Sequence, residues 1–453
     1  MDFLDKLVLP QSEEHLLLLK YLLVLTFILF VPYLSLLTGS TIYSIYFNFK
    51  QKKKHNPVEK RLATVLIDIA TYRKSFPVAL GVIPLLSGAF LYAQLLHTSG
   101  LNTGVYLLFA LLLFIISIFF LYIYKYSVHI DDLFGIINSE SLDNSDINTK
   151  EKYYEYKERA FNVYNFASIA GLAVLLISSY IFIASVDIAL NTSKWGDVSI
   201  LERFFSWSTI FYFGYFILSS LAVTSAGMLF YYFRPVPEKI NESEEYLNYV
   251  KKFGISTGLV FTLLLPIFII FNIISLPNFS LSGLVFTAAI ISVFLLLILA
   301  NLFYLMIKEN RVKFITTVIA LFVLVFLFVI IRDQSAFNSA SGKHMANLSA
   351  EFAEYEVMLK EKMGVSVASI SGEEIFNGRC VACHAFDEKV VGPPYNEVLS
   401  KYEGDLASLS EFILNPVKVN PDYPPMPDQG LKPAEASAVA EYIISVYKGE
   451  TEQ

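Results

Sequence analysis

Cysteine is nearly absent from this chain of 453 residues, which has two, and histidine is scarce, with six. Two cysteines exclude a framework of several disulfides, and a structural zinc site needs more ligands than the segment around them offers. Charged residues make up only 17% of the chain, against 55% apolar and 15% aromatic residues, which is too apolar for a soluble protein. The net charge of −7 gives no indication of nucleic-acid binding, so no nucleic-acid partner is expected.

Long apolar segments without charge at their centres are what the chain has in abundance. About 20 helical residues cross the hydrocarbon of a bilayer, and lipid offers no partner to the backbone of an isolated strand. The sequence therefore predicts an all-α fold built on a polytopic bundle of about eight transmembrane helices. The predicted spans are 16–47, 77–97, 103–124, 160–187, 204–232, 253–276, 282–307 and 314–331.

Lysine and arginine are distributed unevenly between the loops. The loops after spans one, three, five and seven hold 20 of them, whereas the N-terminal tail and the other three loops hold Lys6, Lys194 and Arg203. Because cytoplasmic loops are enriched in these residues, we expect the first set in the cytoplasm and both chain termini outside. In the first cytoplasmic loop, residues 58–72 have one apolar helical face, which fits a helix at the membrane interface or one against the protein's own spans.

The composition becomes polar after the last span. We expect residues 1–332 to form the transmembrane bundle with its N-terminus outside. Residues 333–368 are expected to form an external linker that contains an amphipathic helix, and 369–453 a small soluble domain.

Both cysteines lie in one short motif of this last segment, "CVACH", as Cys380 and Cys383 with His384 directly after. Two thiols three residues apart on a helical turn reach the two vinyl groups of one haem and form thioethers, and the histidine presents its imidazole to the iron. A thioredoxin-like dithiol also uses the Cys-x-x-Cys spacing. The predicted external side and the lack of a βαβ pattern around the motif favour haem attachment.

The sequence around the motif resembles the class I, monohaem cytochromes c from residue 369 to residue 448. "SGEEIFNGRCVACH" is similar to their N-terminal helix, "VVGPPYNEV" to the turn after the haem motif, and "KPAEASAVAEYIISVY" to their C-terminal helix. The resemblance implies that 369–453 is a small all-α cytochrome c domain. It implies one haem c attached covalently to Cys380 and Cys383, with His384 as one axial ligand of the iron.

Two further segments complete the expected haem site. In the family, a proline follows the glycine of this turn, and the proline carbonyl accepts the other N–H of the histidine. The resemblance implies this role for Pro393, which follows Gly392. The second axial ligand is predicted to be Met426, because the prolines around it in "PDYPPMPDQGL" stiffen its loop and a thioether favours reduced iron. A haem with both axial positions filled has no open place for substrate, so the domain is expected to carry electrons and not to catalyse alone.

Eight spans exceed what anchoring a cytochrome requires. Spans one, two and five resemble those of the large subunit of bd-type quinol oxidases and bd-like oxidoreductases, in segments such as "VALGVIPLLSGAFLYAQL". In that family histidines of spans one and five bind haem b, and the matching places here hold Phe27 and Gly214 or Tyr215. The resemblance therefore implies a subunit without the haem b ligands, which pairs with a haem-bearing companion.

These features together predict an electron-transfer subunit of a respiratory complex, placed in the bacterial cytoplasmic membrane with its cytochrome c domain on the periplasmic side. The expected partners are a companion haem-bearing membrane subunit and a redox protein that docks on the external face. Residues 369–453 hold 14 acidic and 6 basic side chains, which favours a partner with a basic docking face.

An alternative interpretation places redox cofactors in the bundle itself, as quinol or b-type haem. His15 and His97, at similar predicted depth on neighbouring spans, are its candidate haem ligands. A third interpretation is a transporter or sensor with the cytochrome as redox input. Asp187, near the outer end of span four, is interpreted as an interfacial carboxylate.

Overall fold

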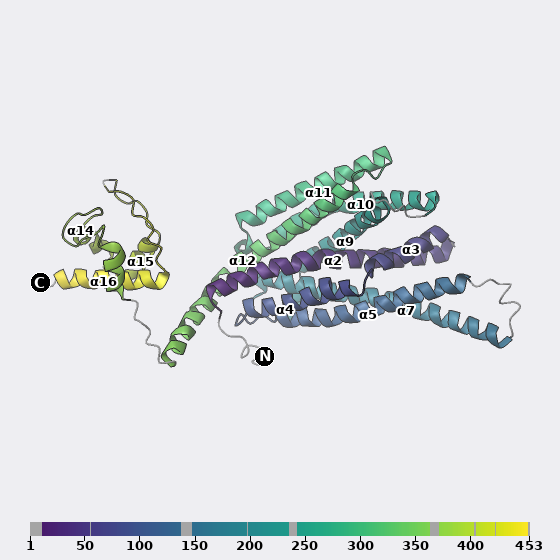
Figure 1. Cartoon of the computed structure of the whole chain (residues 1–453), viewed down its shortest axis with the longest axis horizontal. Helices are drawn as coiled ribbons and strands as arrows, with labels where there is room; N and C mark the ends of the chain where they lie inside the picture. Colours follow the sequence, from purple (N-terminus) through teal and green to yellow (C-terminus); the bar gives the residue numbers. More distant parts are fainter. Residues whose placement is uncertain are drawn as a thin grey trace. The chain divides into compact units, whose positions relative to one another are not determined.

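The protein divides into two compact units, Met1–Ala353 and Glu354–Gln453. All regular elements in the described part of this computed structural model are helices, and the longest of them lie in the first unit (Figure 1). The residues that the structure describes are 11–54, 56–136, 147–196, 198–234, 242–362, 371–402, 405–421 and 423–451.

Eight helical segments within the described residues are long and apolar enough to cross a membrane, which confirms the predicted all-α bundle. The second and fifth of these segments each combine two successive elements, η1 with α4 and α8 with α9. The elements of this unit are α2 (Glu13–Lys54), α3 (Pro57–Ala70), η1 (Pro77–Val82), α4 (Ile83–Leu95), α5 (Thr103–Ile136), α7 (Ile147–Leu190), η2 (Thr192–Lys194), α8 (Ile200–Phe204), α9 (Trp207–Phe233), α10 (Glu244–Ile274), η3 (Asn278–Ser280), α11 (Gly283–Glu309) and α12 (Ile315–Lys362).

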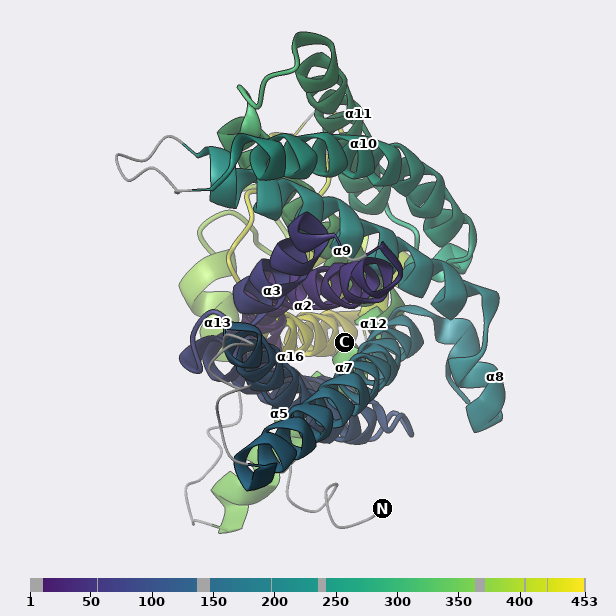
Figure 2. The same ribbon diagram turned by 90° about the vertical axis from the view of Figure 1, so that its right-hand side faces the viewer.

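Helix α2 lies at the centre of the bundle. It packs against α3, α4, α7 and α9, while α5 packs along α7 and α9 along α10. Figure 2 shows α2 between α9 on one side and the pair α5 and α7 on the other. A Cβ on Gly39 would lie 2.2 Å from the carbonyl oxygen of Ser220, so only glycine permits this approach of α2 to α9. Small residues at helix crossings are the usual means of close packing in membranes.

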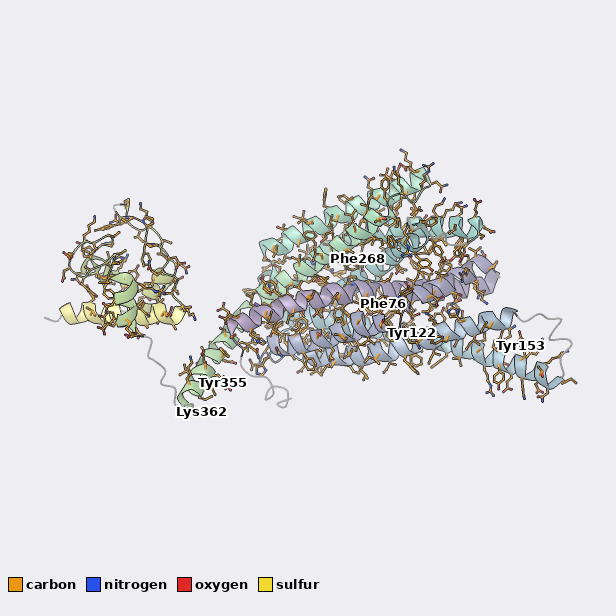
Figure 3. All side chains as sticks on the ribbon, viewed as in Figure 1. Phe76, Tyr122, Tyr153, Phe268, Tyr355 and Lys362 are labelled. Atoms are coloured by element: carbon orange, nitrogen blue, oxygen red, sulfur yellow. The ribbon has the colours of Figure 1, made fainter. Side chains whose placement is uncertain are left out.

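The outward faces of the spans carry large apolar side chains (Figure 3). Phe119, Phe166 and Ile290, on three different helices, are 64%, 66% and 68% exposed. Exposure of apolar surface to water costs roughly 25 cal/mol per Å², and a continuous apolar surface marks contact with a membrane or partner. The exterior of this unit is therefore suited to lipid.

Helix α3 rests on the protein's own spans. Leu62, Leu66 and Ile67 on its apolar face are fully buried, and the helix packs on α2 and α5. The Glu59 carboxylate, also buried, pairs with Lys50 of α2 at 2.7 Å. Of the two interpretations of residues 58–72, the structure favours packing against the bundle.

Helix α12 runs without a break through the segment that the sequence analysis assigns to a linker. The helix extends from Ile315 to Lys362, whereas the eighth span was predicted to end at 331. Polar residues do not end it, because Ala336, Phe337 and Ser341 continue a buried face beyond that point. The predicted boundaries at 332 and 368 remain predictions, and 363–370 lie outside the described residues.

Asp187, interpreted from the sequence as an interfacial carboxylate, is buried within the protein and paired. Its carboxylate is 2.5 Å from the Lys194 ammonium and accepts hydrogen bonds from the hydroxyls of Ser208, at 2.5 Å, and Thr209, at 2.7 Å. A buried ion pair is tolerated when its remaining hydrogen bonds are satisfied. This cluster ties the η2 turn to α7 and α9.

The second unit folds its short helices around a core of its own. The helix α13 crosses α16 closely, since a Cβ on Gly372 would lie 2.2 Å from the Ala438 carbonyl oxygen. Phe376, Leu399 and Ile443 are buried in this core. The elements are α13 (Gly372–Ile375), η4 (Phe376–Cys380), α14 (Tyr395–Val398), η5 (Leu399–Tyr402), α15 (Leu406–Leu414) and α16 (Pro433–Thr451).

Candidate functional site

Cys380, Cys383 and His384 stand on one turn at the end of η4. The amide of Val381 donates to the Phe376 carbonyl at 3.0 Å and closes a π-helical turn, which ends the helix. The amides of Cys383 and His384 then both donate to the Cys380 carbonyl, at 3.1 and 3.0 Å. Both cysteines are free thiols. Local backbone hydrogen bonds therefore hold all three reactive side chains within one tight turn.

The loop after the motif returns to the histidine. The Gly392 amide donates to the Cys383 carbonyl at 2.8 Å, and this places the Pro393 carbonyl oxygen 3.2 Å from His384 Nδ1. A carbonyl only accepts, so Nδ1 carries the proton and Nε2 is left with a free lone pair. The Tyr395 ring stacks on the imidazole, with centroids 4.9 Å apart and planes 19° apart, and fixes its plane.

Burial sets the protonation of this turn. It lowers the pKa of His384 below the ordinary value for histidine, and the hydrogen bond to the Pro393 carbonyl opposes this only in part. The ring is therefore neutral at pH 7, the form that binds a metal. Burial also raises the pKa of the Cys380 thiol and of the Tyr395 hydroxyl.

Met426 lies on the loop between α15 and α16. Prolines on both sides restrict the backbone φ angles of the loop. The Arg379 side chain donates to the Gln429 carbonyl, and the Gly430 amide donates to the Asp428 carboxylate at 2.8 Å. Arg379 belongs to the turn that carries the cysteines, so its hydrogen bond joins the methionine loop to that turn. Sequence analysis gave no role to Arg379 or to Tyr395.

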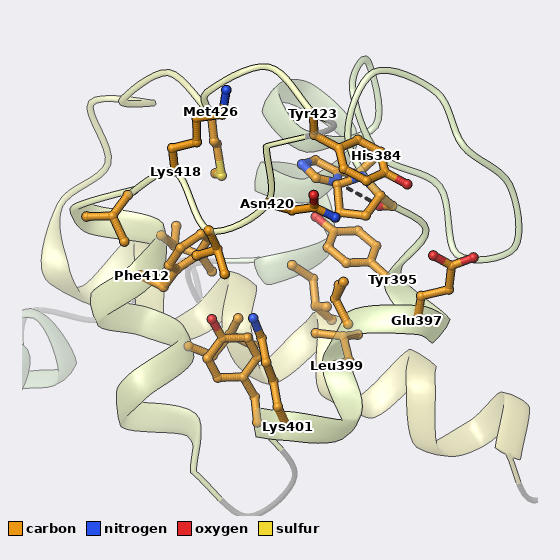
Figure 4. Close-up of a pocket in the computed structure, with 18 of the residues that line it drawn as sticks. His384, Tyr395, Glu397, Leu399, Lys401, Phe412, Lys418, Asn420, Tyr423 and Met426 are labelled. Atoms are coloured by element: carbon orange, nitrogen blue, oxygen red, sulfur yellow. Dashed lines mark hydrogen bonds between the residues drawn. The ribbon is translucent and has the colours of Figure 1, made fainter.

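The predicted site residues meet around two cavities that share part of their lining. The smaller, of about 90 Å³, is lined by both cysteines and by the histidine, Gly392, Pro393 and Met426. The larger, of about 540 Å³, is lined by His384 and Met426 together with mainly apolar side chains. Figure 4 shows Met426 and His384 on opposite sides of the same space, with Tyr395 below the histidine. All six predicted site residues are thus brought together.

The residues present fit a haem. The larger cavity is within the roughly 300–1,000 Å³ typical of cofactor pockets, and its floor is apolar, with Leu399 and Ile443 buried beneath it. A neutral imidazole with a free Nε2 stands at one side and a thioether at the other, while two free thiols line the adjoining edge. This donor set suits iron coordination by nitrogen and sulfur with covalent attachment by the thiols.

Comparisons with known proteins agree with this geometry. The family model for cytochrome c matches residues 369–446. Cytochrome c-551 of Pseudomonas denitrificans is 40% identical over 80 residues, which are 17% of this chain and 98% of that protein. The C-terminal part of the chain therefore belongs to the cytochrome c family. Cytochrome c-551 of Azotobacter vinelandii is 35% identical over 80 residues, 17% of this chain and 96% of the relative.

A third relative, cytochrome c-552 of Hydrogenobacter thermophilus, is 29% identical over 94 residues, 20% of this chain and 95% of that protein. No solved structure matches the chain significantly. The cytochrome c domain implies covalently bound haem c and one-electron transfer, and domains of this kind are typically extracytoplasmic. None of these matches supports the resemblance of the bundle to bd-type oxidases.

The two histidines of the alternative interpretation lie at the ends of helices. His15 is exposed in the first turn of α2. His97 is partly buried in the turn after α4, where its backbone forms a hydrogen bond with the ring of His344. Phe27, for which the resemblance to bd-type oxidases implied the place of a haem ligand, packs edge-to-face on Phe182 with centroids 5.6 Å apart. Haem b binding at His15 and His97 remains the alternative interpretation.

Gly392→Ala should disturb the histidine more than any other single-methyl addition near the site. A Cβ at Gly392 would lie 2.2 Å from Cε1 and 2.7 Å from Nδ1 of the His384 ring. Because overpacking typically costs about 1–3 kcal/mol, we expect a lower melting temperature and an altered Soret spectrum. The matched control is Gly378→Ala, since nothing lies within 4 Å of a Cβ there. Identical spectra and melting temperatures for the two variants would contradict the close contact.

Proposed function

We propose that this protein is a membrane-integral c-type cytochrome subunit that relays electrons through one haem c within a respiratory complex. The observation that carries the proposal is the convergence of two thiols, a neutral imidazole and a thioether on one apolar cavity in a cytochrome c domain. Its site is the bacterial cytoplasmic membrane, with the cytochrome c domain on the periplasmic side. The uneven distribution of lysine and arginine supports this orientation.

In this proposal each residue of the chain has a separate task. Cys380 and Cys383 would hold the haem through thioether bonds, and His384 and Met426 would ligate its iron. Pro393 accepts the Nδ1–H of the histidine, which fixes the tautomer and raises the basicity of Nε2. Bound haem iron exchanges one electron at a time. With both ligand positions of the iron filled by the protein, no place would be left for a substrate, so the site would transfer electrons only.

We assign the bundle a structural and docking task within a complex. Its size beyond a simple anchor supports a companion membrane subunit, and the bd-like resemblance of spans one, two and five supports one that carries haem. Catalysis then belongs to the companion and not to this chain. The alternative subunit, which binds quinol or haem b in its own bundle, differs in cofactor content.

Cofactor content of the purified full chain tests the proposal. We expect pyridine haemochrome spectra to show haem c alone, in a ratio of one haem per chain, and a redox titration to show a single one-electron wave. A b-type spectrum at comparable intensity would favour the alternative. A preparation with no c-type signal after expression with haem-attachment enzymes would refute the proposal.

Electron exchange with a basic partner should depend strongly on salt. Residues 369–453 carry 14 acidic and 6 basic side chains, and complementary charge raises association rates by about ten-fold or more. We expect the bimolecular rate with a small basic c-type cytochrome to fall between about 0.01 M and about 0.15 M salt, as the Debye length drops from about 30 Å to about 8 Å. Stopped-flow absorbance measures it. An acidic cytochrome is the control, and its rate should rise with salt. A rate that does not change with salt for either cytochrome would contradict a partner with a basic docking face.

A further inference from the structure

Arg332 is a fully buried charge that the cytochrome function does not use. Its side chain is 1% exposed, inside α12, where the apolar span meets the polar continuation of the helix. Nε and Nη2 both donate to Oδ1 of Asp333, at 2.9 and 2.7 Å. Nη1 is buried and has no hydrogen-bond partner in the described part of the chain. Leaving such a donor unpaired is costly, so a missing acceptor is implied.

A cavity lies beside this guanidinium. It has a volume of about 80 Å³ and is lined by α2, α7, α9 and α12, with Arg332 and Asp333 among mainly apolar residues. Phe27, Phe182 and Phe216 form aromatic walls. Tyr215 of α9 also belongs to this lining, and the residue is 6% exposed. The unpaired donor of Arg332 in α12 and the side chain of Tyr215 in α9 thus border one apolar space.

The charge balance selects the kind of ligand. Asp333 already neutralises Arg332, and the Tyr212 hydroxyl donates to the same Oδ1 at 3.4 Å. An anion would bring a charge into a buried site with no cation left to balance it, and burial of an unpaired charge costs several kcal/mol. An uncharged oxygen acceptor avoids that cost and satisfies the unpaired donor of Arg332. The aromatic walls favour a molecule that is otherwise apolar.

The volume limits how much of the ligand enters. About 80 Å³ is well below the roughly 300–1,000 Å³ of a pocket that encloses a drug-sized molecule, so a larger ligand inserts only its polar end. It exceeds the roughly 10–15 Å³ that one water requires, which makes water the competing occupant. We infer that this cavity binds the carbonyl end of an uncharged lipid-soluble molecule, a quinone or an ester-bearing lipid. Its oxygen accepts hydrogen bonds from Arg332 Nη1 and the Tyr215 hydroxyl.

Binding is tested on the full chain in a maltoside detergent, which has no carbonyl group. The probes are a benzoquinone with a ten-carbon tail and a short-chain phosphatidylcholine, each ¹³C-labelled at its carbonyl carbons. Equilibrium dialysis gives the affinity, and infrared difference spectra report a shift of the labelled carbonyl band to lower frequency on hydrogen bonding. Haem c content and melting temperature of every variant report its folding.

Three variants separate the site from general stability. Arg332→Met combined with Asp333→Leu removes both charges and leaves no unpaired one; we expect binding at least ten-fold weaker and no band shift. Tyr215→Phe removes only a hydroxyl, and we expect roughly three- to ten-fold weaker binding. Tyr231→Phe is the control, because this residue of α9 is exposed and does not line the cavity; it should match the wild type.

The two probes separate the two sources of the carbonyl. Saturable quinone binding that is weakest in the Arg332→Met, Asp333→Leu variant, intermediate in Tyr215→Phe and unchanged in Tyr231→Phe supports the site and makes its ligand a quinone. The same pattern with the phospholipid alone makes the ligand an ester-bearing lipid. Absence of saturable binding of either probe, or binding that ignores Arg332 and Tyr215, would overturn the inference and leave water as the occupant. Haem content is measured independently, so failure of this inference leaves the cytochrome proposal standing, whereas saturable quinone binding would also support the alternative subunit that binds quinol in its own bundle.

Discussion

Replacement of both cysteines, Cys380→Ala with Cys383→Ala, is expected to abolish covalent haem attachment completely. The two residues are the only thiols in the sequence, so no other pair can form the thioethers. Haem staining of the full chain after denaturing electrophoresis measures the loss, and the intact mass of the protein measures it a second time. The packing around the turn should survive, because His384 and Gly392 still hold it through the backbone.

The single variants are the controls. Each single variant keeps the thiol of the other cysteine. It should therefore retain one thioether and stain more weakly for haem than the wild type. The pyridine haemochrome spectrum of each single variant should be shifted from that of the wild type, because one vinyl group of its haem has not reacted with a thiol. Persistent staining of the double variant at the wild-type level would show that the haem is anchored elsewhere and would end the assignment of this motif.

The haem site was accessible from sequence because its chemistry is local. Cys380, Cys383 and His384 lie within five residues, and Pro393 follows nine residues after the histidine. A backbone turn of that length has few possible geometries, so residue spacing almost determines which side chains converge. Met426 was found by a different signal, the prolines that stiffen its loop, and the structure places it on the same cavities.

The residues that the sequence analysis missed act across long separations. Arg379 reaches the carbonyl of Gln429, 50 residues away, and no local pattern marks such a contact. Tyr395 was one aromatic among many until the loop stacked it on His384. Their roles follow from tertiary packing, which composition and periodicity do not specify.

The pairing partners of charged residues at the ends of spans were missed for a related reason. Hydropathy treats a charge as the end of a span, so the eighth span was predicted to end at 331, just before Arg332, and Asp187 was interpreted as an interfacial carboxylate. Both are buried instead, Asp187 against Lys194 and Arg332 against Asp333. Whether a charge is exposed or paired inside depends on neighbouring helices, and the eight spans alone do not reveal it.

Met426→Leu is expected to keep the haem attached while lowering its reduction potential. Leucine has nearly the volume of methionine, so the loop and its prolines should remain in place. The thioether favours reduced iron, and axial ligands span about 0.8 V of potential, so we expect a decrease of roughly 0.1–0.3 V. Spectroelectrochemical titration of the full chain measures it. The vacated axial position should also bind carbon monoxide in the reduced state, which the wild type should not.

A second methionine in the same unit gives the matched control for this change. Met358 is 43% exposed on α12 and lines neither cavity of the cytochrome c domain, so Met358→Leu should leave both the potential and the carbon monoxide spectrum unchanged. The paired comparison separates ligation from a general effect of losing a sulfur. If Met426→Leu and Met358→Leu gave the same midpoint as the wild type, with no carbon monoxide binding, another group would have to hold the sixth position. The apolar lining offers few candidates, among which Lys418 and Asn420 border the larger cavity.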